Sequence, residues 1–332
     1  MTKRSGNALY RLAMPPLAAV LCAGLWAQGA QAQDVRPLER VSFYFAAHQD
    51  DWQLFMNPSA FADVTDGKTK TVFIHMTAGD AGLGTGTGGR RHPYYLAREN
   101  GAELAIRFMA DSGDHPGDKI AGRMPFNGHE VYRVSYRNTV AYFLRLPDGH
   151  PSGSGFPGTG FQSLERLRKG DIVALTAVDG STTYQGWTDL VSTVKAILTY
   201  ERGQAKSVQL NVAEQNATIN PRDHSDHRMT AKVALDATSE LGCARRVYYI
   251  DYASARLPEN LNAQQRDQES SVLAVTAAGI LALDHTSIWA RYYRSYLGRN
   301  YFRVEEGAGR CDEPVHALQA AAGQQRTLPG KR

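Results

Sequence analysis

Two short stretches of the chain combine histidine with aspartate at a spacing that suits metal chemistry. The segment HQDD at 48–51 directly follows an apolar run, and the segment DHSDH at 223–227 opens a predicted helix. Imidazole and carboxylate groups are ligands that zinc accepts, and three protein ligands plus one water form its catalytic arrangement. Because adjacent side chains point in different directions, His48 and Asp51 form the better ligand pair, and Asp50 is left free beside the metal.

An α/β framework is expected to position both stretches. Apolar runs alternate with amphipathic segments, which favours a mostly parallel sheet covered by helices on both faces, a Rossmann-like three-layer sandwich. Residues just past the C-terminal ends of such strands line the ligand crevice, so the active site is expected there. The predicted strands are 39–47, 70–77, two within 129–146 around a turn at 137–138, 207–212 and 246–252, and the predicted helices are 94–109, 186–200, 223–241 and most of 263–296.

Other signals compete with this interpretation. The string GTGTGG at 84–89 matches a dinucleotide fingerprint, but it follows the second strand and opens no helix, so a flexible loop at the rim of the active site is the better interpretation. His75 lies within an apolar strand and is expected to be a core residue. Five aromatic residues near strand or loop ends are candidates either for stacking on a sugar or for ordinary core packing: Trp52, Tyr94, Tyr95, Tyr184 and Trp187.

The N-terminal segment 1–32 has the layout of a cleaved secretory signal. A cationic start precedes a short apolar run and the small-residue pattern AQA at 30–32. The alternative, a transmembrane anchor, needs about 20 apolar residues. We therefore expect an exported protein, periplasmic or secreted, with no integral membrane span after cleavage. The mature chain is predicted to hold one domain at 33–315 and a flexible tail at 316–332.

Export bears on the cysteines and on the charge. Two cysteines remain in the mature chain, Cys243 and Cys311, and an oxidising compartment favours a disulfide between them over two free thiols. The whole chain has 37 basic and 33 acidic residues. Removing three basic residues at each end leaves 31 basic against 33 acidic residues in the body, so no nucleic-acid partner is expected.

Over roughly residues 39–255 the chain resembles the PIG-L (LmbE-like) zinc-dependent N-acetylglucosaminyl de-N-acetylases. The family's AHPDD(E), TxGE/DxG, Arg/Glu-helix and HPDH-type motifs correspond to AHQDD at 47–51, TAGDAG at 77–82, Arg98-Glu99 and HSDH at 224–227. Two departures matter: Gln49 replaces the usual proline, and Trp52 replaces the usual acidic residue. Neither position is a metal ligand in the family, so the departures are expected to change the rigidity of the loop and the shape of the pocket.

The resemblance implies a role for each matched residue. His48, Asp51 and His227 would bind one Zn²⁺ per chain, or another divalent metal in its place. Asp50 would be the general base toward a water whose pKa zinc lowers from about 15.7 to about 7. His224 would stabilise the oxyanion or protonate the leaving amine, with Asp226 orienting it.

Two further residues are assigned to substrate binding, each with a plainer alternative. Arg98 points to the substrate pocket in the family's pattern, whereas a surface arginine on a helix is the alternative. Asp80 is expected to hydrogen-bond the site from behind, or simply to cap its own turn. The expected function is removal of the N-acetyl group from an N-acetylated sugar or glycoconjugate. A catalytically silent glycan-binding module and an amidase for a larger acyl group are the alternatives.

Overall fold

An eight-stranded mixed sheet organises the part of the chain that the computed structural model describes, residues 38–312. The strand order is β10-β9-β8-β1-β2-β5-β4-β3, in which the five central strands from β9 to β5 run parallel, and each outer strand pairs antiparallel with its neighbour. A separate small hairpin pairs β6 (Leu175–Thr176) with β7 (Thr183–Tyr184). The large sheet consists of β1 (Arg40–Ala46), β2 (Thr69–Thr77), β3 (Ile120–Phe126), β4 (His129–Tyr136), β5 (Thr139–Leu146), β8 (Ser207–Ala213), β9 (Arg245–Tyr249) and β10 (Phe302–Glu305).

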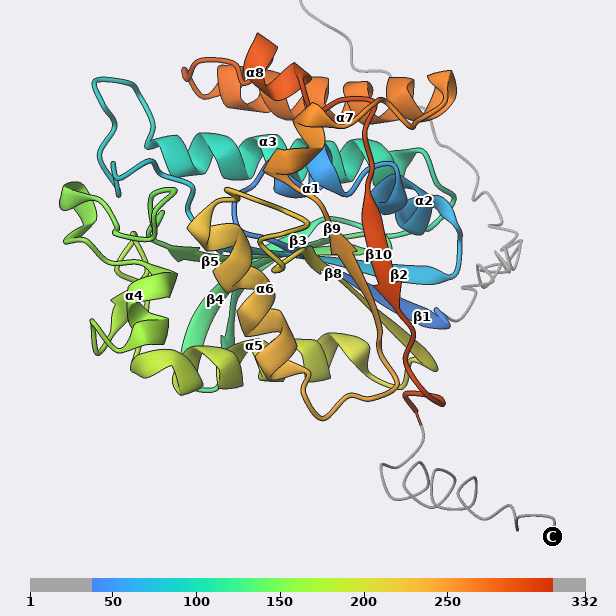
Figure 1. Ribbon diagram of the computed structural model, residues 1–332, viewed down its shortest axis with the longest axis horizontal. Coiled ribbons are helices and arrows are strands. Elements are labelled where there is room, and N and C mark those ends of the chain that lie inside the picture. Colours follow the sequence, from blue (N-terminus) through green and yellow to red (C-terminus); the bar gives the residue numbers. More distant parts are fainter. Residues whose placement is uncertain (1–37, 313–332) are drawn as a thin grey trace, which may run out of the picture. The chain divides into compact units, whose positions relative to one another are not determined.

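Helices cover both faces of this sheet (Figure 1). Each face has its own buried apolar cluster, so the central strands are hydrophobic on both sides, as parallel strands must be. The predicted three-layer α/β sandwich is thereby confirmed. On one side lie α1 (Asp51–Phe55), α2 (Ser59–Thr65), α3 (Tyr94–Asp111), α7 (Ala263–Ala282) and α8 (Arg291–Arg294), and on the other lie α4 (Leu164–Lys169), α5 (Gly186–Arg202) and α6 (Ser225–Ala237).

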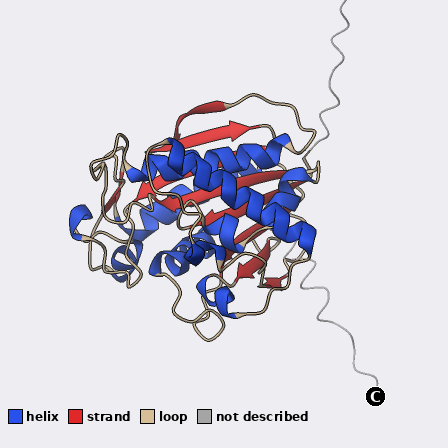
Figure 2. Ribbon diagram, turned by 90° about the horizontal axis from the view of Figure 1, so that it is seen from above, coloured by secondary structure: helices blue, strands red, loops and turns tan. Residues whose placement is uncertain are grey.

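Helices α3 and α7 lie against each other across the strands, as the view in Figure 2 shows. Their backbones meet at Gly101 and Gly279. A Cβ atom at Gly279 would lie 2.7 Å from the Cα of Gly101, and a Cβ at Gly101 would lie 2.7 Å from the carbonyl oxygen of Thr276. Only glycine permits this approach, which holds α3, the helix that carries Arg98, against α7.

The strand order creates a crevice beside the C-terminal end of β1. The chain leaves β1 toward β2 on one side, while β8 returns much later to pair with β1 on its other side. Neighbouring parallel strands whose connections depart in opposite directions open a ligand crevice at their carboxyl ends. Segment 48–51 after β1 and segment 223–227 after β8 therefore face each other, although they are far apart in the sequence.

The predicted elements are present, with two kinds of difference. The helix expected at 223–241 begins only at Ser225, and His224 is its N-cap residue, so His224 and His227 do not share a helical face. Strands β3 and β10 were not predicted. β3 contains a glycine and a proline and is largely exposed, and β10 is only four residues long, so neither has the continuous apolar run that identifies a buried strand.

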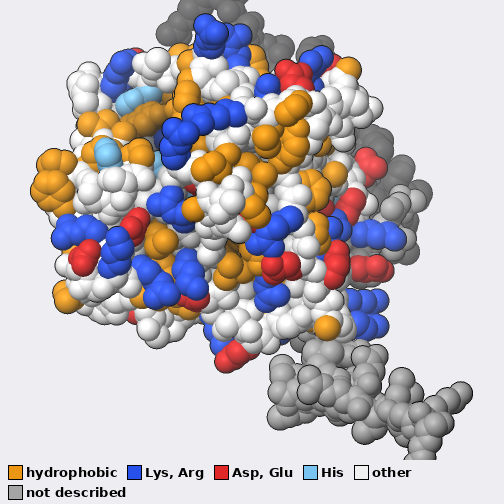
Figure 3. Space-filling model, in the orientation of Figure 1, with side chains coloured by type: hydrophobic (Ala, Val, Ile, Leu, Met, Phe, Trp, Pro, Cys, Tyr) orange, Lys and Arg blue, Asp and Glu red, His pale blue; other side chains and the backbone are white. Residues whose placement is uncertain are grey.

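Charged side chains of both signs are interspersed with hydrophobic and uncharged ones on the molecular face in Figure 3. Among the described residues, no helix is both long and apolar enough to cross a membrane. The predicted signal segment 1–32 and the tail 316–332 lie outside residues 38–312. Export and the domain boundaries 33–315 therefore remain predictions.

A disulfide joins Cys243 and Cys311, as predicted from the two cysteines of the mature chain. Both residues are buried in the cluster formed by the sheet and the α5/α6 layer. The bond fastens the segment after β10 to the loop before β9. Cys311 also donates its backbone N–H to the carbonyl of Lys206, just before β8, at 2.9 Å.

Replacing both cysteines by alanine is expected to lower the free energy of unfolding by about 4 kcal/mol. The bond closes a loop with a sequence separation of 68 residues, and restricting the unfolded chain over such a length gives a stabilisation of this size. Urea unfolding of the double variant and of the wild-type protein, with and without reductant, measures the effect. Reductant should leave the unfolding midpoint of the double variant unchanged. Equal midpoints for the wild-type protein and the double variant in the absence of reductant would contradict the prediction.

A buried carboxyl on α7 provides a pH-dependent prediction. Glu269 is fully buried, its Oε2 accepts the backbone N–H of Gly298 at 2.6 Å, and its Oε1 has no partner. Burial raises the pKa of Glu269 from 4.5 to about 8. Between these values the unfolded chain has lost the proton that the folded chain keeps, so this group makes stability fall as pH rises.

The Glu269→Gln variant should therefore gain stability over the wild type as the pH rises from about 4.5 to about 8, by a few kcal/mol at the upper end. Thermal or urea unfolding across this pH range measures the difference. The exposed Glu130→Gln variant is the control, and its difference from wild type should stay flat. A flat difference for Glu269→Gln would contradict the raised pKa.

Candidate active site

Three predicted ligand atoms lie at the corners of a nearly equilateral triangle. His48 Nδ1 is 3.4 Å from Asp51 Oδ1 and 3.3 Å from His227 Nε2, and His227 Nε2 is 3.3 Å from Asp51 Oδ1. All three side chains are buried. The atoms come from the segment after β1, including the first residue of α1, and from the first turn of α6, which the crevice brings together. We call these three residues the metal triangle.

The size of the metal triangle fits a tetrahedral metal ion. Zinc binds imidazole nitrogen and carboxylate oxygen at about 2.0–2.1 Å, and the ligand atoms of such a tetrahedron are separated by about 3.3–3.4 Å. The three measured edges fall in that range. Three protein donors leave the fourth corner open, which is the arrangement of a catalytic rather than a structural metal. The buried histidine and aspartate side chains thus suit a divalent metal.

Each histidine of the triangle has a carboxylate behind its other ring nitrogen. His48 Nε2 is 3.5 Å from Asp226 Oδ2. His227 Nδ1 is 2.8 Å from Asp223 Oδ1 and 3.0 Å from Asp251 Oδ2. Such partners fix the ring orientation and the tautomer of metal-binding histidines and raise their basicity. The structure therefore supplies both the donor atoms and the groups that aim them.

The electrostatics of this cluster favour a positive charge at its centre. Burial by itself lowers the pKa of His48, but attraction by Asp51 and the nearby carboxylate of Asp226 outweigh it and raise the pKa to about 10. Burial and repulsion by Asp223 raise the pKa of Asp251 to about 7. Excess carboxylate is thus packed around two imidazoles, and either protons or a divalent cation neutralise it.

Asp50, the predicted general base, lies in the same pocket and is not part of the metal triangle. Arg98 of α3 donates a hydrogen bond from Nη2 to Asp50 Oδ1 and another from Nη1 to the carbonyl oxygen of Gly79, at 3.1 Å. Gly79 has φ +53°, and a Cβ atom there would lie 2.9 Å from the Arg98 guanidinium carbon. Arg98 is buried, so the structure places it in the pocket and not on the helix surface.

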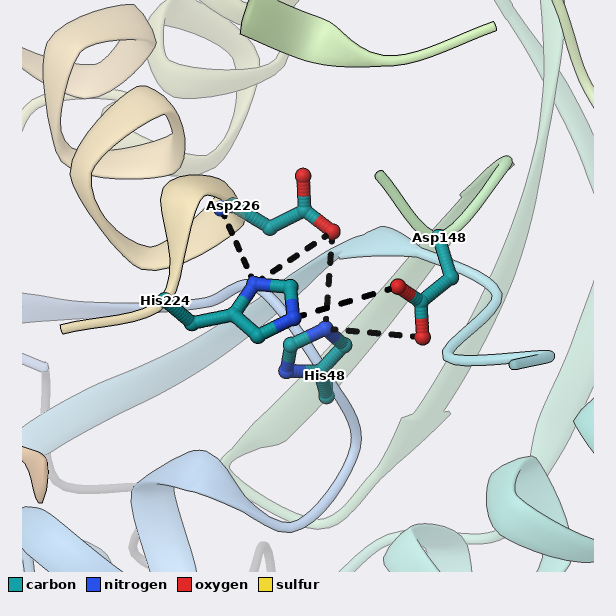
Figure 4. A group of neighbouring side chains, drawn as sticks. All are labelled: His48, Asp148, His224 and Asp226. Atoms are coloured by element: carbon teal, nitrogen blue, oxygen red, sulfur yellow. Dashed lines mark hydrogen bonds and ion pairs between the residues drawn. The ribbon is translucent and has the colours of Figure 1, made fainter. Parts of the chain in front are cut away.

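His224 and Asp148 complete the other side of the pocket (Figure 4). His224 Nδ1 accepts the backbone N–H of Asp226 at 3.1 Å, so its proton sits on Nε2, which faces Asp148 Oδ1 at 4.0 Å. Burial lowers the pKa of His224, and the neighbouring histidines lower it further, so this imidazole is neutral. The Asp226 carboxylate is nearer to His48 than to His224, at 3.5 Å against 3.8 Å, so the orienting contact to His224 comes from the backbone of Asp226.

Asp80 lies behind the pocket wall. Its Oδ1 accepts the backbone N–H of Asp148 at 2.9 Å, and its Oδ2 accepts that of Gly84 at 2.7 Å. Asp80 is not among the residues that line the pocket. It therefore caps its own glycine-rich loop and at the same time fixes the loop that carries Asp148.

Sequence reasoning missed two acidic residues of this site. Asp148 and Asp251 each stand two residues past the end of their strands, β5 and β9, and Asp50 stands four residues past the end of β1. The glycine, proline and serine content of segment 148–160 is typical of a surface loop and by itself gives no sign of a functional aspartate. The signal that was available is an aspartate two to four residues past the C-terminal end of a parallel strand, which recurs after four of the five central strands.

Tyrosines form the outer wall of the pocket. Tyr252 follows β9, and its ring centre is 5.0 Å from that of His227 and 6.0 Å from that of Tyr296. Tyr292 is more than half exposed at the mouth. These tyrosines lie on the segment after β9, on α8 and on the turn that follows α8, and none of them was among the five aromatic candidates from the sequence. The tyrosines of the lining are Tyr252, Tyr292, Tyr293 and Tyr296.

The two departures from the family motif are accommodated inside the fold. Trp52 is fully buried and donates its indole N–H to His75 Nε2 at 3.1 Å, while His75 Nδ1 bonds the carbonyl of Tyr142 at 3.2 Å. Burial lowers the pKa of His75 to about 4, so it is a neutral core residue, as expected. Gln49 donates to the carbonyl of Thr77 at 2.9 Å and ties the loop after β1 to the end of β2. Trp52 is thus a core residue and no sugar platform.

Comparisons with known proteins add two structural neighbours. No family model matches the sequence, and no curated protein matches it. Among solved structures, the chain is similar to N,N'-diacetylchitobiose deacetylase from Pyrococcus horikoshii complexed with its inhibitor MPG, with 13% identity, a TM-score of 0.45, and coverage of 83% of this chain and 88% of that chain. It is also similar to a deacetylase of the teicoplanin biosynthesis pathway, with 14% identity, a TM-score of 0.42, and coverage of 74% and 86%. Both neighbours are deacetylases.

Proposed function

We propose that the protein is an exported, zinc-dependent hydrolase that removes the N-acetyl group from an N-acetylglucosamine-type substrate. The observation that carries this proposal is the metal triangle with a separate carboxylate, Asp50, in the same pocket. A site that only binds a metal does not need a further carboxylate beside the ligands. Hydrolysis of an amide needs a base that is not itself a metal ligand, and Asp50, which is paired with Arg98, is such a group.

His48, Asp51 and His227 would hold the metal, with Asp226, Asp223 and Asp251 as the outer partners of the two imidazoles. When bound, zinc makes a water acidic at neutral pH and polarises the acyl oxygen of the substrate. Asp50, Arg98 and His224 carry out the remaining steps.

Asp50 takes the proton from the attacking water as the oxygen bonds to the acyl carbon. Arg98 fixes the orientation of Asp50 through their ion pair, so that one carboxylate oxygen faces the substrate. His224, neutral and protonated on Nε2, donates a hydrogen bond to the acyl oxygen as negative charge develops there. The C–N bond then breaks, and the proton held by Asp50 passes to the leaving nitrogen, which gives acetate and an amine.

Acetate release from N-acetylated mono- and oligosaccharides tests the proposal. Protein stripped with a chelator should be inactive, and one equivalent of Zn²⁺ should restore turnover. Substrates with longer acyl chains are assayed beside the acetylated ones. Cleavage of the longer amides alone would assign a different amidase activity, and saccharide binding without any cleavage by the metal-loaded protein would point to a silent glycan-binding module.

A further inference from the structure

A second compartment adjoins the pocket of the metal triangle. Tyr252, Tyr292 and Tyr296 line both cavities, so these tyrosines form a shared wall. The second compartment is also lined by Arg222 and Arg256, and no aspartate or glutamate lines it. We call it the arginine compartment.

The two cavities differ in charge. The pocket of the metal triangle is lined by three aspartates, Asp50, Asp51 and Asp148. The arginine compartment has two guanidinium groups, and within residues 38–312 neither of them has an ion pair or a side-chain hydrogen bond. By contrast, Arg98, which lines the pocket of the metal triangle, is paired with Asp50. Two unpaired guanidinium groups at the edge of a cavity offer charge-assisted hydrogen bonds to an anion.

Both arginines are fixed to the metal triangle through the backbone. Arg222 directly precedes Asp223, and Arg256 ends the short 3₁₀ helix Tyr252–Arg256 that follows Asp251. Asp223 and Asp251 are the two carboxylates that hold His227 Nδ1. The backbone of each arginine is therefore positioned by the same segments that orient a metal ligand, while both side chains are exposed.

The backbone at Arg222 supports a specific placement. Its φ is +60°, a left-handed conformation that non-glycine residues adopt rarely and at an energetic cost. Pro221 precedes it, and the carbonyl of Asp223 after it accepts a hydrogen bond from Arg228. Such a conformation persists only where the surroundings determine it. The side chain of Arg222 thus leaves the backbone from a fixed point in the wall of the arginine compartment.

We propose that the substrate carries an acidic group, phosphoryl or carboxylate, that binds Arg222 and Arg256 while the acylamino group lies at the metal triangle. This inference rests on the proposed function and narrows its substrate to N-acetylated saccharides with a negative charge. The sugar ring would lie along the shared wall of Tyr252, Tyr292 and Tyr296, whose faces suit a sugar next to polar groups.

Calorimetric titration of the full-length, zinc-loaded protein tests this inference. The probes are N-acetylglucosamine and N,N'-diacetylchitobiose in three forms: neutral, phosphorylated, and carrying a carboxylate. The acidic forms should bind about ten- to a hundredfold more tightly than the neutral ones, because charge-assisted contacts replace contacts to water. The advantage should shrink as the salt concentration rises. The preferred acidic form distinguishes a phosphoryl from a carboxylate group.

The Arg222→Gln/Arg256→Gln double variant should lose the preference for acidic over neutral saccharides. The single Arg256→Gln variant should lose part of it. Lys206→Gln removes an exposed cation just before β8, at the N-terminal end of a central strand and so away from the pocket. This variant should keep the preference. Equal affinity of wild-type protein for acidic and neutral forms would overturn the inference, as would a preference that survives the double substitution.

Failure of the inference and failure of the proposed function give different results. Acetate release from neutral saccharides with no preference for acidic forms would overturn the inference and leave the deacetylase. Tight binding of acidic saccharides through the two arginines without acetate release would support the arginine compartment and contradict the deacetylase.

Discussion

Replacing His227 with alanine should remove the metal from the protein and abolish hydrolysis. His227 supplies one corner of the metal triangle, 3.3 Å from each of the other two donor atoms. With two donors left, metal affinity should fall by more than the about 10–100-fold that loss of an outer partner costs. Metal analysis after gel filtration should find about one zinc per wild-type chain and almost none in the variant.

The alanine also removes the partner of two buried carboxylates, Asp223 and Asp251, so the variant must be shown to be folded by circular dichroism. Asp51→Asn is a second variant that keeps the shape of the side chain and weakens the same site. His115→Ala is the matched control, because His115 lies in the loop before β3 and not among the groups that suit a metal ion. Full zinc occupancy in folded His227→Ala protein would refute the ligand set.

Replacing Asp50 with asparagine should abolish turnover while the protein keeps its zinc. Asparagine occupies the same volume and still offers an oxygen to Arg98, so the pocket keeps its geometry. It cannot take a proton from the attacking water, and loss of a general base lowers kcat by about 10²- to 10⁴-fold. Because Asp50 is not a corner of the metal triangle, zinc content should stay near one per chain.

Acetate release and zinc content are therefore measured on the same preparations of this variant. Asp171→Asn is the control, since Asp171 is exposed and far along the chain from both clusters. Loss of zinc together with activity would make Asp50 a ligand, and retained turnover would show that another group accepts the proton.

Much of the fold follows from local pattern. The strands β1 and β2 are apolar runs that end in polar segments, and α5 has a regular apolar face, so their positions could be read to within two residues. Edge strands such as β3 and β10 could not, because an edge strand lacks the two-sided burial that produces a continuous apolar run. The predicted start of α6 is two residues too early. His224 has an extended backbone conformation and caps the helix with its side chain, and neither property can be read from residue type.

The site divides in the same way. Two dense clusters of histidine and aspartate indicate metal binding from residue type and spacing, whereas the choice of His48, Asp51 and His227 as the ligands is what the resemblance to the de-N-acetylases implies. Asp148 and Asp251 stand alone in the sequence and become part of the site only because β5 and β9 end at the same edge of the sheet as β1 and β8. The four tyrosines of the pocket wall have no such spacing, and chain connectivity after β9 places them.

The sequence by itself determined the chemical character of this protein: an α/β frame, two cysteines that pair, and a set of donors suited to a divalent metal with a base beside it. These are properties of residue types and of neighbours along the chain. The tertiary structure decided how the groups are matched. In the folded chain the Asp226 carboxylate lies behind His48 and not His224, and Asp80 binds the backbone of Asp148 behind the pocket wall. Arg222 and Arg256 lie beside the tyrosines that the two cavities share. Such pairings depend on which strand ends meet in space, and parallel strands from distant parts of the chain meet only after folding.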